Sequence, residues 1–389
     1  MHVCHLTKYY PPVAGGIETH VQTLARRQVE LGARVSVVCV DHRESPAKVR
    51  GQTWEDDHGV RVCRVARKMS LAKWDLCPGL SPLLRKLQQP SHGIDVLHLH
   101  TPNPTMTLAL RAAGMQKPLF ITHHSDVVKQ RFLGSALALL ERPLMRQSSR
   151  VLTTSPCYAQ GSRALAPWLP KVETLPLGIE LEPLLAPSSN ALRYRDEFRG
   201  RYGVPLWLCV GRLVYYKGID VAIRALRKMP GTLVIVGEGP LRRSLERTAH
   251  KEGVADRVVW LGKLTDDALV GAYHAATALL FPSNARSEGF GLVQVEAMAS
   301  GCPVVNTDIP FSGVPWVCPN DDCGLTVPMN DPSALAAAAL RLLESEQRTR
   351  LIDSARRRAI EQFSARTMAE RSLRHYRDIV SATAPTCGP

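Results

Sequence analysis

Long apolar runs are missing from this chain of 389 residues. The first twelve residues, MHVCHLTKYYPP, hold no signal-peptide core, and no later segment reaches the roughly 18 uninterrupted apolar residues of a membrane-spanning helix. We therefore expect a cytoplasmic protein. Hydrophobic residues make up 45% of the sequence and charged residues 22%, so a folded chain can bury full cores.

Two metal signatures are also absent. The ten cysteines are spread from Cys4 to Cys387 without a CxxC pair, so reduced, buried thiols are expected, and a zinc site stays open only for Cys318 and Cys323. No DxD sequence occurs, which argues against a divalent cation held by carboxylates. We expect no metal and no cofactor.

The positive charge is concentrated in the first half of the chain. Residues 1–195 hold 25 Lys and Arg against 14 Asp and Glu, a balance of +11, whereas residues 196–389 hold 24 against 21, a balance of +3. No nucleic-acid-binding motif accompanies the basic residues, so we expect no nucleic-acid partner. An anionic membrane surface or a phosphate-bearing molecule fits this charge equally well.

Short apolar runs alternate with segments of helical period, which predicts an α/β fold with parallel sheets. A chain of this length exceeds one core, so two domains are expected. The predicted strands of the first are Met1–Leu6, Arg34–Val40, Val60–Val65, Asp95–His100, Pro118–Thr122, Arg150–Thr154 and Lys171–Leu175. Those of the second are Leu206–Val210, Thr232–Val236, Val258–Leu261, Ala278–Phe281 and Pro303–Asn306.

Helices are expected at Thr19–Leu31, ended by Gly32, and at Gly218–Lys228 and Leu292–Ser300. Leu181–Tyr202, which is rich in proline and serine, is predicted to link the two domains. Doubly wound sheets bind ligands beyond the carboxyl ends of their strands, so two facing domains would create a cleft for two substrates.

The segment Ser287–Glu296, SEGFGLVQVE, predicts an anion site next to two carboxylates. Gly289 and Gly291 allow backbone to approach a ligand, and the following helix N-terminus favours phosphate. Glu288 and Glu296 only accept hydrogen bonds when ionised, so sugar hydroxyls are suitable partners. The alternative is that both carboxylates are solvated surface groups.

A second phosphate-binding pattern is Val210–Asp220, VGRLVYYKGID. Gly211 and Arg212 follow a strand, and Lys217 precedes the glycine that opens a helix. A guanidinium fork and an ammonium suit a diphosphate. Ordinary surface cations are an equally weighted alternative.

The first strand is followed by Gly15 and Gly16, where a Rossmann-type loop accommodates phosphate. The sequence YYPPVAGGIETH is not GxGxxG, so NAD is a poor fit, and a simple tight turn is the alternative.

Histidines follow a later strand in Ile121–Asp126, ITHHSD. Strand alternation lets only one of His123 and His124 face a ligand. His98 and His100 are expected to be core or supporting residues, with no third ligand spaced for a metal.

These motifs together resemble a known family, the retaining GT-B glycosyltransferases of family 4, also called group 1 glycosyltransferases. The resemblance covers nearly the whole chain, and SEGFGLVQVEAMASGCPVV is its most specific part. It implies a GT-B architecture of two Rossmann-like doubly wound domains facing a central cleft. Residues 1–190 would bind the acceptor and residues 191–365 the nucleotide sugar, and residues 366–389 would cross back to the N-terminal domain as a helix.

The resemblance also assigns roles in the donor-binding domain. Glu288 matches the family's glutamate at the sugar hydroxyls, and Glu296 the one at the ribose. Arg212 and Lys217 match the pair that binds the diphosphate. The backbone around the first glutamate is expected to bind the donor through Gly289, Phe290, Gly291 and Leu292.

In the N-terminal domain, Gly16 matches the loop near the phosphates. The family's histidine in a Thr-x-His context falls on His124, with Thr122 as the threonine, so His124 and Glu288 are the expected catalytic residues. Acceptor contacts are expected from Gly15, His100 and His123. The chain departs from the family after PVVNTDIP, where many members carry a Gly-Gly and an acidic residue, so no role is carried over there.

The resemblance implies a metal-independent transfer with retention, in which the leaving diphosphate helps to deprotonate the acceptor. The combination THHSDVVKQ and SGVPWV is similar to bacterial members that build O-antigen or other surface polysaccharides from GDP-sugars. We therefore expect transfer of a hexose, mannose first, from a GDP-sugar, with a UDP-sugar next. The acceptor would be a saccharide or a polyprenyl-linked saccharide.

Peripheral contact with the inner face of the membrane is suggested by Lys129–Arg150, a basic stretch with an apolar helical face. A core-facing helix pair explains the same pattern. Two other functions stay open: a nucleotide-sugar 2-epimerase of the same architecture, and a non-catalytic nucleotide-sugar-binding subunit.

Overall fold

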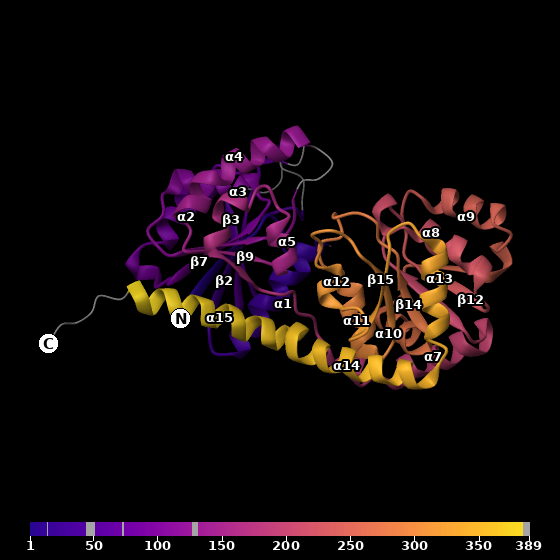
Figure 1. Ribbon diagram of the computed structural model, residues 1–389. Coiled ribbons are helices and arrows are strands. Elements are labelled where there is room, and N and C mark those ends of the chain that lie inside the picture. Colours follow the sequence, from indigo (N-terminus) through magenta and orange to yellow (C-terminus); the bar gives the residue numbers. More distant parts are fainter. Residues whose placement is uncertain (14, 44–50, 72–73, 127–130, 384–389) are drawn as a thin grey trace. The chain divides into compact units, whose positions relative to one another are not determined.

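The computed structural model describes residues 1–13, 15–43, 51–71, 74–126 and 131–383. The chain divides into two compact units. Unit 1 consists of Met1–Ile179 and Ala365–Pro389, and unit 2 is the continuous stretch Glu180–Ser364. Each unit has its own sheet with helices on its faces (Figure 1).

Unit 1 is built on an eight-stranded sheet of order β10-β9-β8-β7-β1-β2-β4-β3. All neighbours are parallel except β3 and β4. The strands are β1 (His2–Leu6), β2 (Arg34–Val40), β3 (Gln52–Asp57), β4 (Val60–Val65), β7 (Val96–Thr101), β8 (Leu119–His123), β9 (Arg150–Thr153) and β10 (Val172–Thr174), with a separate hairpin of β5 (Met69–Leu71) and β6 (Trp74–Leu76).

The helices of unit 1 cover both faces of this sheet. They are α1 (Gly16–Glu30), α2 (Leu80–Leu87), α3 (Pro104–Ala113), α4 (Arg131–Gln147), α5 (Pro156–Gln160) and α15 (Ala365–Thr383), with short 3-10 turns at Pro90–His92 and Ala166–Lys171. Side chains alternate along β1, so Cys4 packs with the residues of α2 and α3, whereas Val3 packs with those of α1 and α15. Figure 1 shows α15, in yellow, running alongside α1.

Unit 2 is built on a six-stranded parallel sheet of order β13-β12-β11-β14-β15-β16. Its strands are β11 (Leu206–Val210), β12 (Thr232–Val236), β13 (Val258–Gly262), β14 (Ala278–Phe281), β15 (Val304–Thr307) and β16 (Gly324–Val327). Its helices are α6 (Glu182–Leu185), α7 (Ser189–Tyr202), α8 (Ile219–Ala225), α9 (Arg242–Lys251), α10 (Asp266–Ala275), α11 (Leu292–Ser300), α12 (Val314–Val317), α13 (Pro332–Arg341) and α14 (Ser345–Phe363), with 3-10 turns at Tyr215–Lys217, Leu226–Lys228 and Ala255–Arg257.

The predicted linker is wrong in detail, because Leu181–Tyr202 is largely helical. Ser188 accepts a hydrogen bond from the backbone N–H of Ala191 and so caps the N-terminus of α7. The composition of this segment had instead suggested a linker. Helix α7 packs closely on α10, where a side chain on Gly271 would strike the backbone of Ala191. The compact units accordingly divide after Ile179, earlier than the expected boundary at residue 190.

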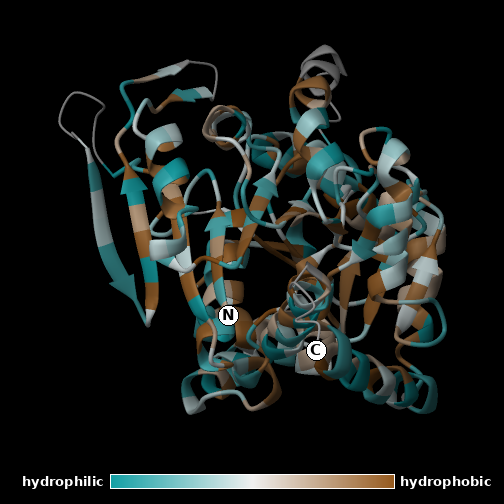
Figure 2. Ribbon diagram, turned by 90° about the vertical axis from the view of Figure 1, so that its left-hand side faces the viewer, coloured by the Kyte–Doolittle hydropathy of each residue, from teal (hydrophilic) through white to brown (hydrophobic). Residues whose placement is uncertain are grey.

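Four strands were not predicted from the sequence: β5 and β6 of the hairpin, and one strand in each of the two large sheets. Edge strand β3, with the sequence QTWEDD, is mostly exposed, so it lacks the apolar run of a central strand. Figure 2 shows it in pale to hydrophilic colours, whereas the inner strands are largely hydrophobic. Strand β16, GLTV, is short and contains a glycine.

The order of strands reverses once in each sheet, between β1 and β7 in unit 1 and between β11 and β14 in unit 2. Such a reversal leaves a crevice outside the carboxyl ends of the strands, where open α/β sheets bind ligands. All the motifs singled out from the sequence follow strands that lie at or next to one of these two reversals of strand order. No helix in the described part of the chain is long and apolar enough to span a bilayer.

Candidate active site

The loops that follow β11 and β14 are held together by direct backbone contact. The N–H of Asn284 donates to the carbonyl of Tyr216 at 2.9 Å. Gly218 has φ +60°, and a Cβ there would lie 2.0 Å from the carbonyl oxygen of Pro282. Only glycine allows this approach, so the glycine after Lys217 fixes the distance between the two motifs.

Lys217 and Glu288 form an ion pair inside this crevice. The Lys217 Nζ lies 2.6 Å from Glu288 Oε2, with side chains 13% and 11% exposed, and the hydroxyl of Ser283 lies 3.4 Å from the same oxygen. The sequence assigned Lys217 to phosphate and Glu288 to sugar hydroxyls separately, and the structure joins them. An ammonium has three N–H donors, so Lys217 can contact the carboxylate and still donate to a phosphate oxygen.

Arg212 lies at the carboxyl end of β11 and is exposed. No carboxylate or carbonyl partner of its guanidinium is found among the described residues. A free guanidinium fork beside a buried ammonium provides two cations at one sheet edge, as the binding of a diphosphate requires.

Helix α11 begins at Leu292, and its N-cap Gly291 adopts φ +80°. A side chain at that position would crowd Gln294 and the ring of Phe281. The Phe290 ring is buried, 5.6 Å from that of Phe363, so only its backbone is placed for a ligand. The free N–H groups at the start of α11 make this turn suitable for an anion.

Glu296 lies one turn into α11 and accepts a hydrogen bond from the Tyr273 hydroxyl at 2.5 Å through Oε2. Its Oε1 has no partner among the described residues. Burial raises the pKa of Glu296, while the Tyr273 hydrogen bond and the charge of Lys217 act against that rise. Glu296 therefore presents one oxygen for a vicinal hydroxyl pair.

The loop after β15, to which the sequence assigned no role, supports the Glu288 loop. The Ser312 hydroxyl donates to the carbonyl of Glu288, and the N–H of Gly313 donates to that of Gly289 at 2.9 Å. Arg286 also donates to the carbonyl of Phe311, whose ring is 55% exposed. The SGVPW departure from the family pattern thus positions the backbone of the candidate site.

In unit 1, Gly15 and Gly16 lie exposed at the start of α1. A Cβ at Gly15 would collide with the carboxylate of Glu18, whereas one at Gly16 would meet nothing within 4 Å. The open space at Gly16 agrees with a loop that a ligand can approach.

His123 and His124 point to different partners, as strand alternation predicts. His123 is buried and its ring nitrogens contact Thr101 and Asp126, at 3.3 and 2.9 Å. His124 is partly exposed, and its Nε2 lies 3.0 Å from His100 Nδ1. Of the two, only His124 is partly exposed.

His100 is 2% exposed and has both ring nitrogens in hydrogen bonds, to His5 and His124. This placement argues against the expected direct contact of His100 with an acceptor, because neither nitrogen is left for one. Its position is one of support behind His124.

More histidines gather here than the sequence suggested. His20 on α1 is buried beside His100 and His124, with ligand atoms within 4.8 Å of one another, and His5 lies equally close to His98 and His100. The expectation that no third histidine completes such a group was wrong, because β1 and α1 supply it. Neither nitrogen of His20 has a hydrogen-bond partner within the described part of the chain.

Cys318 and Cys323 belong to no group of three metal-ligand side chains among the described residues. Burial raises the pKa of the Cys318 thiol well above its ordinary value and that of Cys323 to about 11. Both are free thiols, and burial keeps them protonated.

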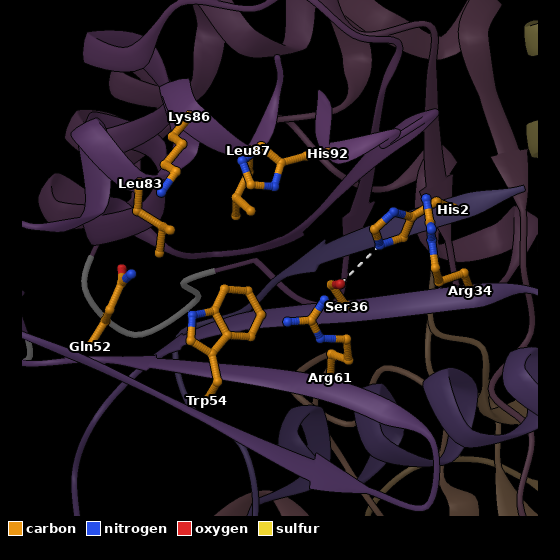
Figure 3. Close-up of a pocket in the computed structure, with 10 residues that line it drawn as sticks. All are labelled: His2, Arg34, Ser36, Gln52, Trp54, Arg61, Leu83, Lys86, Leu87 and His92. Atoms are coloured by element: carbon orange, nitrogen blue, oxygen red, sulfur yellow. Dashed lines mark hydrogen bonds between the residues drawn. The ribbon is translucent and has the colours of Figure 1, made fainter. Parts of the chain in front are cut away.

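A separate pocket of about 230 Å³ lies beside α2, near the start of β1 and β2 (Figure 3). Arg34, Arg61 and Lys86 line it, and no carboxylate does so among the described residues. Trp54 stacks under Arg61, with 5.0 Å from the guanidinium carbon to the ring centroid. The pocket is thus basic, and it lies at the amino ends of the strands of unit 1, whereas the motifs of unit 1 lie at the carboxyl ends.

The basic stretch Lys129–Arg150 falls mainly on α4, and residues 127–130 lie outside the described part of the chain. Leu137, Leu144 and Met145 are buried, whereas Leu139 is 65% exposed. The described apolar side chains of α4 therefore face mostly inward, as a core-facing helix requires.

Three curated relatives resemble this chain over most of its length. The O-antigen chain mannosyltransferase C of Escherichia coli is 28% identical over 384 residues, covering 98% of this chain and all of the relative. The D-rhamnosyltransferase WbpZ of Pseudomonas aeruginosa is 28% identical, covering 89% and 88%. A GDP-mannose-dependent alpha-(1-6)-phosphatidylinositol monomannoside mannosyltransferase of Mycobacterium tuberculosis is 29% identical, covering 88% and 89%.

Solved glycosyltransferase structures share the fold. HepE of Anabaena in complex with UDP superimposes with a TM-score of 0.76 at 19% identity, covering 97% of this chain and all of that one. Sucrose-phosphate synthase of Thermosynechococcus elongatus gives 0.75 at 22% identity, covering 98% and 100%.

Two family matches divide the chain between them. Residues 14–183 match Glycosyltransferase Family 4, and residues 194–358 match Glycosyl transferases group 1. They follow one another and leave out only the ends and a short middle segment. The chain therefore consists of a Glycosyltransferase Family 4 domain followed by a Glycosyl transferases group 1 domain, has the GT-B fold and is a glycosyltransferase.

Proposed function

We propose that this glycosyltransferase transfers mannose, or a related hexose, from a GDP-sugar to a saccharide or polyprenyl-linked saccharide during synthesis of a cell-surface polysaccharide. The Lys217–Glu288 pair is the main support for the proposal, because an ammonium group that suits phosphate lies against a carboxylate that suits sugar hydroxyls. The relatives named for mannosyl and rhamnosyl transfer, one of them GDP-mannose-dependent, support the choice of sugar and base.

In this proposal the donor binds to unit 2. Arg212 and Lys217 bind the diphosphate and do the work of a divalent cation, Glu288 binds the sugar hydroxyls, and Glu296 binds the ribose through Oε1. No metal takes part. Glu288 Oε1 has no partner among the residues that the structure describes, while Lys217 holds Oε2, so a hydroxyl contact does not require the ion pair to break.

Unit 1 supplies the acceptor side of the reaction in this proposal. His124 is its partly exposed histidine, and it meets a hydroxyl of the sugar or the acceptor. The transfer proceeds with retention, and the leaving diphosphate takes the acceptor proton. Proton NMR of the product's anomeric signal tests retention, and a product of inverted configuration would contradict it.

A thermal-shift panel tests the donor. We expect GDP-mannose at 100 times its dissociation constant to add about 2.7 kcal/mol to the stability of the protein, which raises the melting temperature by roughly 5–10 °C. UDP-, ADP- and dTDP-sugars should shift it far less. A shift with a UDP-sugar alone would show that the donor carries uracil and not guanine. The absence of a shift with every sugar nucleotide would overturn the proposed donor class.

Contact with an anionic membrane is a separate part of the proposal, in keeping with a cytoplasmic protein at the inner face of the membrane. The basic pocket beside α2 and the +11 balance of residues 1–195 support it. We expect sedimentation with phosphatidylglycerol vesicles but not with phosphatidylcholine, and a loss of binding in Arg61→Ala with Lys86→Ala. The matched control changes two exposed arginines of α9, Arg243 and Arg247. Failure to sediment would remove the membrane contact alone.

A further inference from the structure

A chain of hydrogen bonds runs from helix α15 to His124. It passes from Ser372 through Gln28 on α1 and His5 on β1 to His100 on β7. Successive donor–acceptor distances are 2.8, 2.8 and 3.0 Å, and the last step to His124 is also 3.0 Å. Every linking side chain between the two ends is buried, so no water competes for these bonds.

The direction of this chain is fixed at its α15 end. The Ser372 hydroxyl donates its one hydrogen to the carbonyl of Ala369, at 2.7 Å, and so can only accept from Gln28. Tyr376 is compatible with this orientation, because its hydroxyl can donate to His98 Nδ1, 2.6 Å away, and accept from the Gln28 amide nitrogen at 3.5 Å. That end is therefore the NH2 group, and the amide oxygen faces His5.

Each histidine then has one possible tautomer. The Gln28 oxygen must accept from His5 Nε2–H, which leaves His5 Nδ1 to accept from His100 Nε2–H. His100 Nδ1 is then an acceptor, and only His124 Nε2–H can donate to it. His124 is left with an unprotonated Nδ1, for which no partner exists among the described residues.

We propose that Ser372, Gln28, His5 and His100 are positioning residues that hold His124 as the Nε2–H tautomer, so that its Nδ1 accepts a hydrogen bond from a substrate hydroxyl. The role in turnover rests on the proposed function, whereas the tautomer itself does not. A lone pair attracts a hydroxyl hydrogen and repels a phosphate oxygen. His124 thereby selects a hydroxyl group and excludes phosphate.

The surroundings keep these rings neutral. Burial lowers the pKa of His5 to about 4 and that of His124 well below its ordinary value, and the neighbouring His20 lowers the latter further. A neutral chain is required, because a proton added to any of the three rings would abolish its acceptor nitrogen.

The hydrogen bonds also argue against a metal among these histidines. His5, His98 and His100 each have both ring nitrogens in hydrogen bonds, so none keeps a lone pair for an ion. A metal held by His20, His100 and His124 would displace the bond between the last two.

Long-range proton–nitrogen NMR of protein labelled with 15N-histidine tests the tautomer directly. His124 is assigned by the signal lost in His124→Gln. We expect a protonated Nε2 and an unprotonated Nδ1 at pH 7.5. The opposite tautomer, an imidazolium, or a stoichiometric metal detected by mass spectrometry would each overturn the proposal.

Two variants test the chain. His5→Phe and Gln28→Leu both remove a link without touching the ligand side of His124, and we expect His124 to become a mixture of tautomers in each. With the nucleotide sugar that binds, kcat should fall about 10-fold with KM for the donor unchanged. The control Cys4→Ala perturbs the same strand on its other face and should leave the tautomer and kcat unchanged.

The outcomes separate the two proposals. A correct tautomer with no turnover of any nucleotide sugar would refute the proposed function and leave the hydrogen-bonded chain standing. A mixed tautomer in His5→Phe with an unchanged kcat would refute the role of the chain in turnover. A single tautomer in both variants would show that the chain does not set it.

Discussion

The two units build their candidate sites in opposite ways. Unit 2 is one continuous stretch of chain, and its site depends on charge and on glycines that let neighbouring loops touch. Unit 1 joins residues from both ends of the sequence, and its site rests on neutral, buried histidines linked by hydrogen bonds. The site of unit 2 can be recognised from short sequence motifs. The site of unit 1 forms only when the fold brings residues together that are distant in the sequence.

Removing residues 365–389 should produce the largest difference in stability between the two units, because it destabilises unit 1 alone. Helix α15 buries Met368, Leu373 and Tyr376 against unit 1, and losing three such side chains costs about 5–9 kcal/mol, which approaches the full stability of a domain. Hydrogen exchange should rise sharply in β1 and β7 while the strands of unit 2 stay protected. Equal protection from hydrogen exchange in both sheets would show that the stability of unit 1 does not depend on α15.

Glu288→Gln tests the charged site. The change keeps the shape but leaves the Lys217 ammonium unpaired in a largely buried place, and it removes a charged acceptor for sugar hydroxyls. We expect kcat/KM to fall about 100-fold. Glu246→Gln on α9, where the carboxylate is half exposed and pairs with Arg242, is the control. Equal activity of the two variants would exclude Glu288 from the reaction.

Arg212→Ala should weaken donor binding more than turnover. The Arg212 guanidinium is exposed and has no partner in the described ranges, so it contributes little to stability, and the melting temperature of the free protein should stay constant. We expect KM for the donor to rise about 10-fold, the loss of one charged hydrogen bond. Arg243→Ala provides the matched exposed arginine. An increase in KM for the acceptor alone would contradict the diphosphate role.

The histidine cluster predicts a pH dependence that the charged site does not share. Burial lowers the pKa of His20 to about 3, against 6.5 in the unfolded chain. Between these values the unfolded state binds the extra proton, so stability falls as the pH drops below about 6.5 and is flat above it. In urea unfolding, His20→Phe should reduce the slope below pH 6 by up to about 1.4 kcal/mol per pH unit. An unchanged slope would mean that His20 is protonated in the folded protein.

The contrast between local motifs and contacts made by the fold also explains which features could be predicted from the sequence. The central strands were predicted because parallel strands buried on both faces are continuous apolar runs, and β11 and β14 begin and end at the predicted residues. Helix α7 was missed because its capping Ser188 and the prolines before it are also typical of turns.

Within the sites, Lys217 and Glu288 were found as separate signals, since each follows its own strand, but their pairing needed the order β11-β14. The link from His5 to His100 was not predictable from spacing. It depends on the register that sets His5 opposite His98 and on a face shared with α1. Alternate histidines in LHLH and a further one in the first strand were the signal available.

Helix α15 has a consequence for the order in which the protein is made. The ribosome completes β1 to β10 before unit 2, yet the core beside Val3 and Phe120 lacks its cover until residues 368–376 have emerged after unit 2. Unit 2, being continuous, can finish folding while unit 1 still waits. The half of the enzyme that is synthesised first is therefore the half that matures last.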